Sequence, residues 1–175
     1  MIFVMLSSSP SPSVQYEAAV TLLSLSRAPT SLKAASHAFI NLLQNVSDHN
    51  VKMIVLDRLS EIKEKYGKIL QEMVMEILRG IFTYVFPPQA WLTLSPNPVI
   101  VKKTIEIALD LSTPTNIGDI MALFRKELSR AQSDDFKDGE FRIILIDSVS
   151  QAVAKFPEMM TSDIIFAVLD YITDA

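Results

Sequence analysis

One short pattern occurs four times in the 175 residues, and its spacing restricts the fold more than any other feature. Each copy is an apolar residue followed by Gln, Lys or Arg, with further apolar residues at helical spacing after it. The intervals are 37, 50 and 40 residues, counted between Val14-Gln15, Val51-Lys52, Val101-Lys102 and Phe141-Arg142. Repeats of roughly 40 residues with two helices each are typical of HEAT and armadillo proteins. The pattern therefore predicts an all-α fold, an α-solenoid of antiparallel helix pairs, which favours a scaffold over an active site.

The turn signals divide the chain into four helix pairs within one solenoid fragment spanning residues 1–175. Pro29, Gly67, Pro114 and Pro157 interrupt or end the helical stripes. The expected pairs cover 13–46, 48–83, 98–131 and 138–174, and an irregular insertion of about 84–97 accounts for the long middle interval. A solenoid needs atypical terminal repeats to cover its open ends. Because neither end has a polar closing helix, we expect a piece of a longer array.

The repeated pattern has a structural explanation. The residues three positions before its copies are Ser11, Asp48, Pro98 and Asp138. Ser and Asp at such positions accept hydrogen bonds from the first N–H groups of a helix. The apolar residue then starts the core stripe, which in the second copy reads Val51, Ile54, Val55, Leu59 and Ile62. The neighbouring Lys or Arg is expected to stay at the solvent edge with its stem over apolar surface.

Composition excludes several classes of protein. The net charge of −4 argues against wrapping nucleic acid, which requires a basic face. There is no cysteine, so disulfides, thiolate metal sites and cysteine nucleophiles are excluded together. Residues 1–6 are apolar but lack the basic start of a signal peptide, and residues 77–94 are too interrupted to span a membrane. The mean hydropathy of +0.28 predicts apolar surface that other repeats or partner chains cover.

Few residues offer catalytic chemistry. His37 lies within a helical stripe, and His49 lies in a turn beside Asp48 with no second metal ligand nearby. Asp134 and Asp135 are adjacent carboxylates, and an acidic surface loop explains them better than paired catalysis does. No glycine-rich phosphate loop is present, because each glycine stands alone. We therefore predict no enzyme activity, no catalytic residue, no cofactor and no metal site.

Three candidate binding motifs also have simpler explanations. Asn45-Val46-Ser47 fits a glycosylation site, but Val46 is expected in a buried stripe. Lys63, Lys65 and Lys68 alternate with Glu61 and Glu64, which is typical of a solvated helix face. Lys102 and Lys103 are adjacent on an exposed ridge. An acidic partner surface could dock on this ridge, and plain solvent exposure is the simpler interpretation.

Three helices carry a family resemblance. Residues 12–19, 50–59 and 101–111 read PSVQYEAA, NVKMIVLDRL and VKKTIEIALDL. In wording and order they resemble the adaptin N-terminal family, the α-solenoid trunk shared by large subunits of clathrin adaptors and of coatomer, the COPI vesicle coat. The resemblance covers roughly residues 10–175. It implies a non-enzymatic interaction scaffold in Golgi-to-endoplasmic-reticulum and intra-Golgi vesicle transport. The implied partners are other coatomer subunits and an Arf-type small GTPase, and the implied location is cytoplasmic, peripheral on Golgi and vesicle membranes.

The chain departs from the family pattern at residues 82–97, where only a short turn is expected. This stretch contains three of the nine prolines, the only Trp and no charged residue. A lineage-specific loop that packs on the solenoid and an intron translated by a faulty gene model explain it equally well. Alternatives to the coat are another HEAT or armadillo scaffold, such as a clathrin-adaptor large subunit or a nuclear-transport or phosphatase scaffold.

Overall fold

The computed structural model describes residue 6, residues 9–85, 97–131 and 139–159, and residues 162, 166 and 169. This part of the chain contains seven α-helices, one short 3-10 helix and no β-strand, which confirms the expected all-α class. Of the expected insertion at about 84–97, residues 84 and 85 end a helix and Asn97 caps the next one, so its expected bounds are too wide, and residues 86–96 lie outside the described residues. The acidic loop at 133–135, the cap Asp138 and most of the last helix also lie outside them. The chain divides into two compact units, Met1–Leu111 and Ser112–Ala175.

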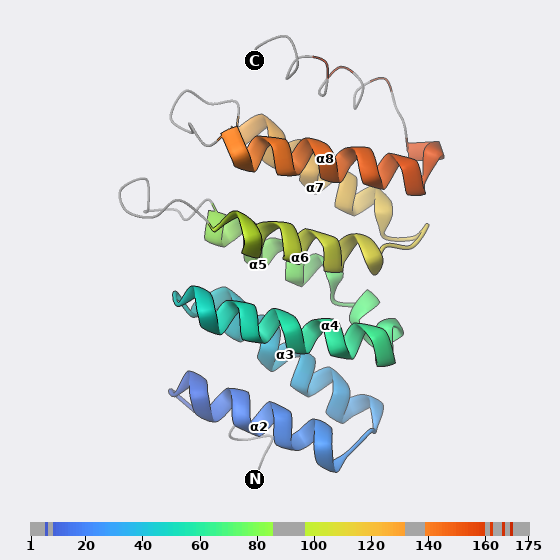
Figure 1. Cartoon of the computed structure of the whole chain (residues 1–175). Coiled ribbons are helices and arrows are strands. Elements are labelled where there is room, and N and C mark those ends of the chain that lie inside the picture. The colour runs from blue at the N-terminus through green and yellow to red at the C-terminus, as the bar shows by residue number, and fades with distance from the viewer. Residues whose placement is uncertain are drawn as a thin grey trace. The chain divides into compact units, whose positions relative to one another are not determined.

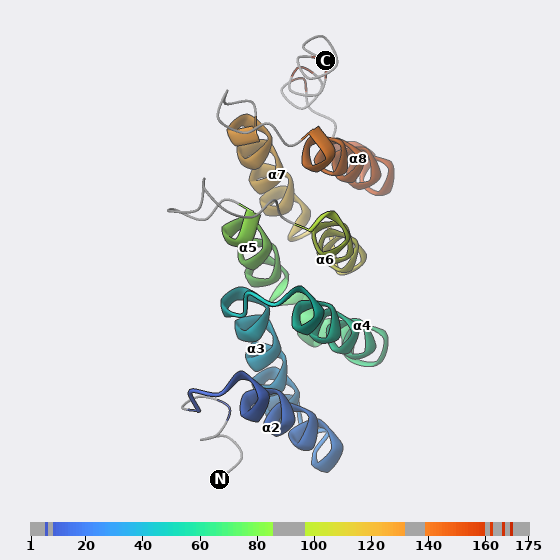
Figure 2. The ribbon, with the colours of Figure 1, turned by 60° about the vertical axis from the view of Figure 1, so that its left-hand side comes forward.

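The first unit is built from two layers of helices. Helices α2 (Pro12–Leu25), α4 (His49–Gln71) and α6 (Pro98–Asp110) form one layer, and α3 (Pro29–Asn45) and α5 (Val74–Val85) form the other (Figures 1 and 2). Helix α3 packs against α2, α4 and α5, and α6 packs against α4 and α5. Within this unit, the two layers are those of an α-solenoid made from antiparallel pairs.

The core of the first unit lies between these layers. Phe39 is fully buried, and its ring meets Tyr16 of α2 edge to face, with centroids 5.7 Å apart. Such a pair contributes about 0.5–1.5 kcal/mol beyond the apolar area that it buries. Around it lie fully buried aliphatic side chains from each layer, among them Leu43, Leu56, Leu59, Ile77 and Leu78.

Helix starts follow the expected chemistry in part. Asp48 caps α4, because its carboxylate accepts from the N–H of Asn50 at 2.7 Å and of Val51 at 3.3 Å. At α6 the cap is Asn97, which accepts from the N–H of Val99 at 3.0 Å. Pro98 occupies the first helical turn instead, where a missing N–H costs nothing. Ser11 precedes α2 without a side-chain cap bond, so the expected capping role there is wrong.

At the start of α4, the buried stripe begins one residue later than the sequence predicts. Its buried positions begin at Lys52 and continue through Val55, Leu56, Leu59 and Ile62. Val51 is half-buried, and Ile54 is 49% exposed, so both were wrongly expected in the core. Val14 of α2 is likewise 41% exposed. Both the expected stripe and the observed stripe have helical spacing. Apolar character alone therefore does not show which residue in the first turn of α4 points into the core.

The break expected at Gly67 occurs one residue earlier, at Tyr66, whose backbone is non-helical with φ −138° and ψ 36°. Two helical stretches meet at this kink inside α4, and the second stretch runs from Gly67 to Gln71. Glu72 and Met73 form the turn before α5. A single glycine weakens a helix by only about 1 kcal/mol, so the chain can resume helical geometry directly at Gly67.

The second unit contains α7 (Ile117–Ala131), α8 (Gly139–Lys155) and the 3-10 helix η1 (Pro157–Met159). Helix α7 packs against α8, and η1 contacts both. Lys155 at the end of α8 donates to the hydroxyl of Ser112 at 3.1 Å. Glu127 of α7 is almost fully buried, and Arg130 donates to its carboxylate at 3.1 Å. Burial raises the pKa of Glu127 above its usual value, although Arg130 and Lys126 act in the opposite direction.

Candidate interaction surface

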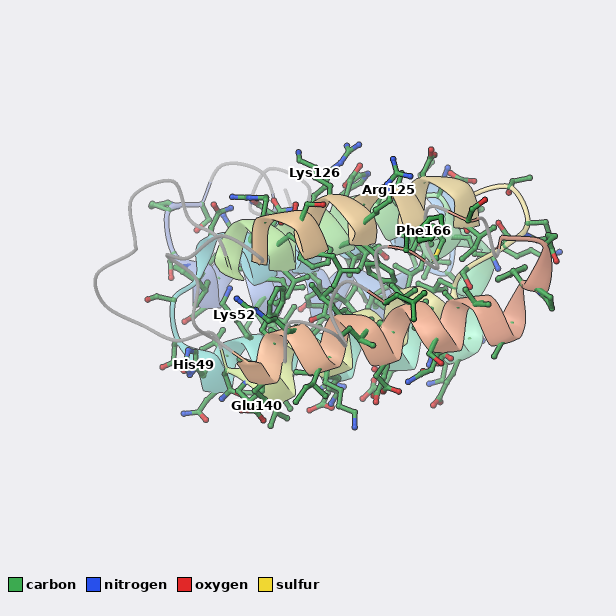
Figure 3. The ribbon with its side chains drawn as sticks, turned by 90° about the horizontal axis from the view of Figure 1, so that it is seen from above. His49, Lys52, Arg125, Lys126, Glu140 and Phe166 are labelled. Atoms are coloured by element: carbon green, nitrogen blue, oxygen red, sulfur yellow. The ribbon has the colours of Figure 1, made fainter. Side chains whose placement is uncertain are left out.

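The two histidines lie on different helices of the first unit. His37 was expected inside a stripe, but it is exposed on α3, where its Nδ1 lies 3.2 Å from Oε2 of Glu76. His49 is the first residue of α4 and lies at the edge of the helices (Figure 3). No group of three or more metal-ligating side chains occurs among the residues described.

Two ion pairs join α4 to α6 along the same layer. Lys103 of α6 pairs with Asp57, and Asp110 of α6 pairs with Lys63. From the first ion pair to the second, the residue number rises along both helices, from 57 to 63 in α4 and from 103 to 110 in α6. The two helices therefore run parallel. Exposed ion pairs contribute about 0.2–1 kcal/mol each, so these pairs chiefly set register.

The same layer continues from α4 to α2 through a hydrogen bond. Arg58 donates from Nε to the hydroxyl of Tyr16 at 3.0 Å, and its other end meets the carboxylate of Glu61 at 3.0 Å. The guanidinium is therefore held between a neighbouring helix and its own helix. Arg58 thereby links the first two helix pairs.

A second set of polar contacts joins α3 to the start of α5 in the other layer. Lys33 pairs with Glu72, and His37 pairs with Glu76 one turn further along each helix. Gln44 donates from Nε2 to the backbone carbonyl of Glu76 at 3.2 Å. In these contacts, three polar residues of α3 are bound to the next helix pair, namely Lys33, His37 and Gln44.

The lysines expected on the solvated helix face and on the exposed ridge therefore divide into two kinds. Lys63 and Lys103 are half-buried and serve the contacts between α4 and α6. Lys65, Lys68 and Lys102 are exposed and form no ion pair with any residue that the structure describes. The solvated-face interpretation stands for these three.

The glycosylation pattern lies at the end of α3. Asn45 is exposed, and its Nδ2 donates to the carbonyl of Asn41 at 2.9 Å. Val46 was expected in a buried stripe, and it is half-buried. The side-chain amide of Asn45 is thus hydrogen-bonded within the last turn of the helix. This bond gives Asn45 a structural role that does not require glycosylation.

Two exposed aliphatic side chains lie at corresponding positions of α4 and α6. Ile54 is one turn before Asp57, and Val99 is one turn before Lys103, so each lies one turn before the ion pair that joins the two helices. Ile54 is 49% exposed and Val99 is 58% exposed. We call them the α4–α6 apolar pair. Neither serves the core, so this pair is the candidate contact for a partner protein.

Lys52 is the largest departure from the sequence expectation. It was expected at the solvent edge, but it is 1% exposed and points between the helices (Figure 3). Its Nζ donates to the backbone carbonyl of Leu43 in the last turn of α3. Burial lowers its pKa from 10.5 to about 8. The only available sequence signal was its helical spacing from Val55, Leu56 and Leu59, which was overlooked because lysine is seldom buried.

No helix among the described residues is both long and apolar enough to cross a membrane. This finding is consistent with the sequence, in which charged residues and prolines interrupt the apolar stretches.

Comparison with known proteins gives one family and a consistent set of relatives. Residues 4–175 match the family described as the adaptin N terminal region. Coatomer subunit beta of Dictyostelium discoideum is 45% identical over 175 residues, which cover 99% of this chain and 18% of that protein. Coatomer subunit beta-2 of Arabidopsis thaliana is 38% identical over 99% of this chain and 17% of its own length. Coatomer subunit beta of Sus scrofa is 36% identical over 95% of this chain and 17% of its own length. The chain thus spans less than a fifth of these relatives.

Proposed function

Because the chain belongs to the adaptin N-terminal family, we propose that it forms part of a structural subunit of the COPI vesicle coat. In this role it is a non-enzymatic scaffold for protein–protein contacts in Golgi-to-endoplasmic-reticulum and intra-Golgi transport. The observation that carries the proposal is the 45% identity to a coatomer subunit beta over 99% of the chain. Its proposed location is cytoplasmic, peripheral on Golgi and vesicle membranes.

The geometry supports a scaffold. Polar links join α2 to α4, α4 to α6 and α3 to the start of α5, so successive helix pairs keep a fixed spacing. Such a scaffold presents outward side chains at regular intervals along one layer. We propose that helix pairs at 13–46, 48–83, 98–131 and 138–174 form one solenoid fragment of this kind.

The proposed partners are other coatomer subunits and an Arf-type small GTPase in its GTP-bound form. The α4–α6 apolar pair is the contact to test first, because Ile54 and Val99 expose aliphatic surface that the core does not use. Contacts at the centre of an interface that bury such side chains contribute more than the charged rim around them.

The experiment measures retention of other coatomer subunits, and of the GTPase loaded with a GTP analogue or with GDP, on the immobilised full-length gene product. A double variant, Ile54→Ser with Val99→Ser, is compared with Leu25→Ser, a 70% exposed apolar residue of the same unit. We expect the double variant to lose at least tenfold in affinity for one partner, about 1.4 kcal/mol, and the control to keep it.

The possible outcomes test the scaffold role and the α4–α6 apolar pair separately. If the full-length gene product retains no coatomer subunit, the scaffold proposal is wrong. If it retains them and the double variant binds as well as the unmodified chain, the role stands and the α4–α6 apolar pair is not the contact.

A further inference from the structure

Residues at the second position of the repeated pattern carry side-chain donors, and two of them make equivalent contacts. Gln15 donates from Nε2 to the backbone carbonyl of Ser9 at 2.7 Å. Lys52 donates from Nζ to the backbone carbonyl of Leu43. In each case a residue in the first turns of a helix reaches back to the chain that precedes the helix. The other two copies, Lys102 and Arg142, follow segments outside the described residues.

The acceptor of Lys52 is one that α3 leaves open. The last four carbonyls of a helix have no partner within it. The carbonyl of Leu42 accepts from the N–H of Val46 at 3.0 Å, and the next carbonyl, that of Leu43, accepts from Lys52. A cation at this end is also favoured by the helix dipole. The lysine therefore completes the end of α3 from the first turns of α4.

An apolar side chain at position 52 would fill the same space without a desolvation cost. The amine is buried at that cost, and what it adds is a directed bond between the last turn of one helix and the beginning of the next. A directed bond restricts rotation of α4 about its own axis, whereas apolar contacts tolerate small rotations. Ile54 lies two residues after Lys52 on α4, so this restriction also fixes the direction in which Ile54 faces.

We propose that the donor at the second position of the pattern, Gln15 in α2 and Lys52 in α4, is a positioning residue that ties each helix to the preceding segment. At Lys52 the tie sets the orientation of the second helix pair relative to the first, and at Gln15 it fixes the start of α2 against the carbonyl of Ser9. Because both contacts lie inside the first unit, the tie can be tested without a partner protein.

The test is hydrogen exchange of backbone amides in the 175-residue chain, comparing Lys52→Met with Lys102→Met. Methionine keeps the length of lysine without the donor, and Lys102 is the exposed residue at the same position of the pattern. In Lys52→Met we expect amide protection at residues 46–52 to fall at least tenfold more than in α6. In Lys102→Met we expect these amides to be unchanged.

A merely space-filling role makes a different prediction. If Lys52→Met lowers protection evenly through the first unit, or leaves residues 46–52 as protected as before, the tie is absent and the proposal is wrong. If Lys52→Met fails to fold, Gln15→Leu decides, because Gln15 is only half-buried. Faster exchange confined to residues 11–15 supports the tie, and unchanged exchange there overturns it.

Discussion

The buried amine of Lys52 makes the stability of the chain depend on alkaline pH in a way that can be calculated. Its pKa is 10.5 for an ordinary lysine and about 8 in the folded protein, because burial disfavours the charged form. Between these values the unfolded chain binds more protons than the folded chain. Stability therefore rises as the pH rises from 8 towards 10.5, and the full cost is present below pH 8.

The magnitude follows from the size of the shift. A difference of one pKa unit corresponds to 1.36 kcal/mol, so the shift in Lys52 corresponds to about 3 kcal/mol at neutral pH. Linkage gives a gain of about 2 kcal/mol between roughly pH 7 and pH 9.5. The bond to Leu43 survives deprotonation, because a neutral amine still donates a hydrogen bond.

The assay is urea unfolding of the unmodified chain and of Lys52→Met across this pH range. Tyrosines and other lysines also titrate above pH 9, and subtracting the variant removes their common contribution. We expect the free energy of unfolding of the unmodified chain to rise by about 2 kcal/mol relative to the variant. A difference that stays constant with pH, or that falls, would show that Lys52 is not desolvated as the structure indicates.

Four further substitutions test the packing, each by urea unfolding at neutral pH. Gly67→Ala should stabilise the chain by about 0.5–1 kcal/mol, because the new Cβ meets nothing closer than 3.9 Å, whereas Gly80→Ala should lose this gain against Gln44, whose Cγ would lie 2.7 Å away. Equal effects would contradict the packing of α5 on α3. Ser36→Ala should raise stability by about 1 kcal/mol, because the buried hydroxyl has no hydrogen-bond partner among the described residues, and a loss would reveal a hidden partner. Phe39→Ala should cost about 3–5 kcal/mol, and a cost below about 1 kcal/mol would place its ring outside the core.

The fold class could be predicted from periodicity because each repeat of a solenoid has a similar pattern of apolar residues and helix starts. Each helix has apolar residues at helical spacing and a recognisable start, and Asp48 caps α4 as its position indicates. The inward face was less predictable. At the start of α4 the chain buries Lys52 and exposes Ile54, because the tie to α3 and the packing of neighbouring helices rotate the stripe by one residue.

The candidate contact surface could not be predicted from sequence for a related reason. Lys63 was expected on a solvated helix face and Lys103 on an exposed ridge, yet both pair with acids of the neighbouring helix. Ile54 was expected in the core stripe, and no sequence pattern marked Val99, yet both are exposed. The charged residues that pair with each other come from helices whose paired residues are more than 40 positions apart in the sequence. A pattern within one helix cannot show which of these residues will meet.

The scaffold role is tested most directly by the composition of the complex in which the gene product occurs. The gene product is tagged in its own cells and purified under mild conditions, and the proteins that accompany it are quantified by mass spectrometry. We expect the other coatomer subunits in amounts equal to that of the tagged protein. Their absence, with the tagged protein recovered alone or with a different helical-repeat assembly, would contradict the proposal that this chain is part of a COPI coat subunit.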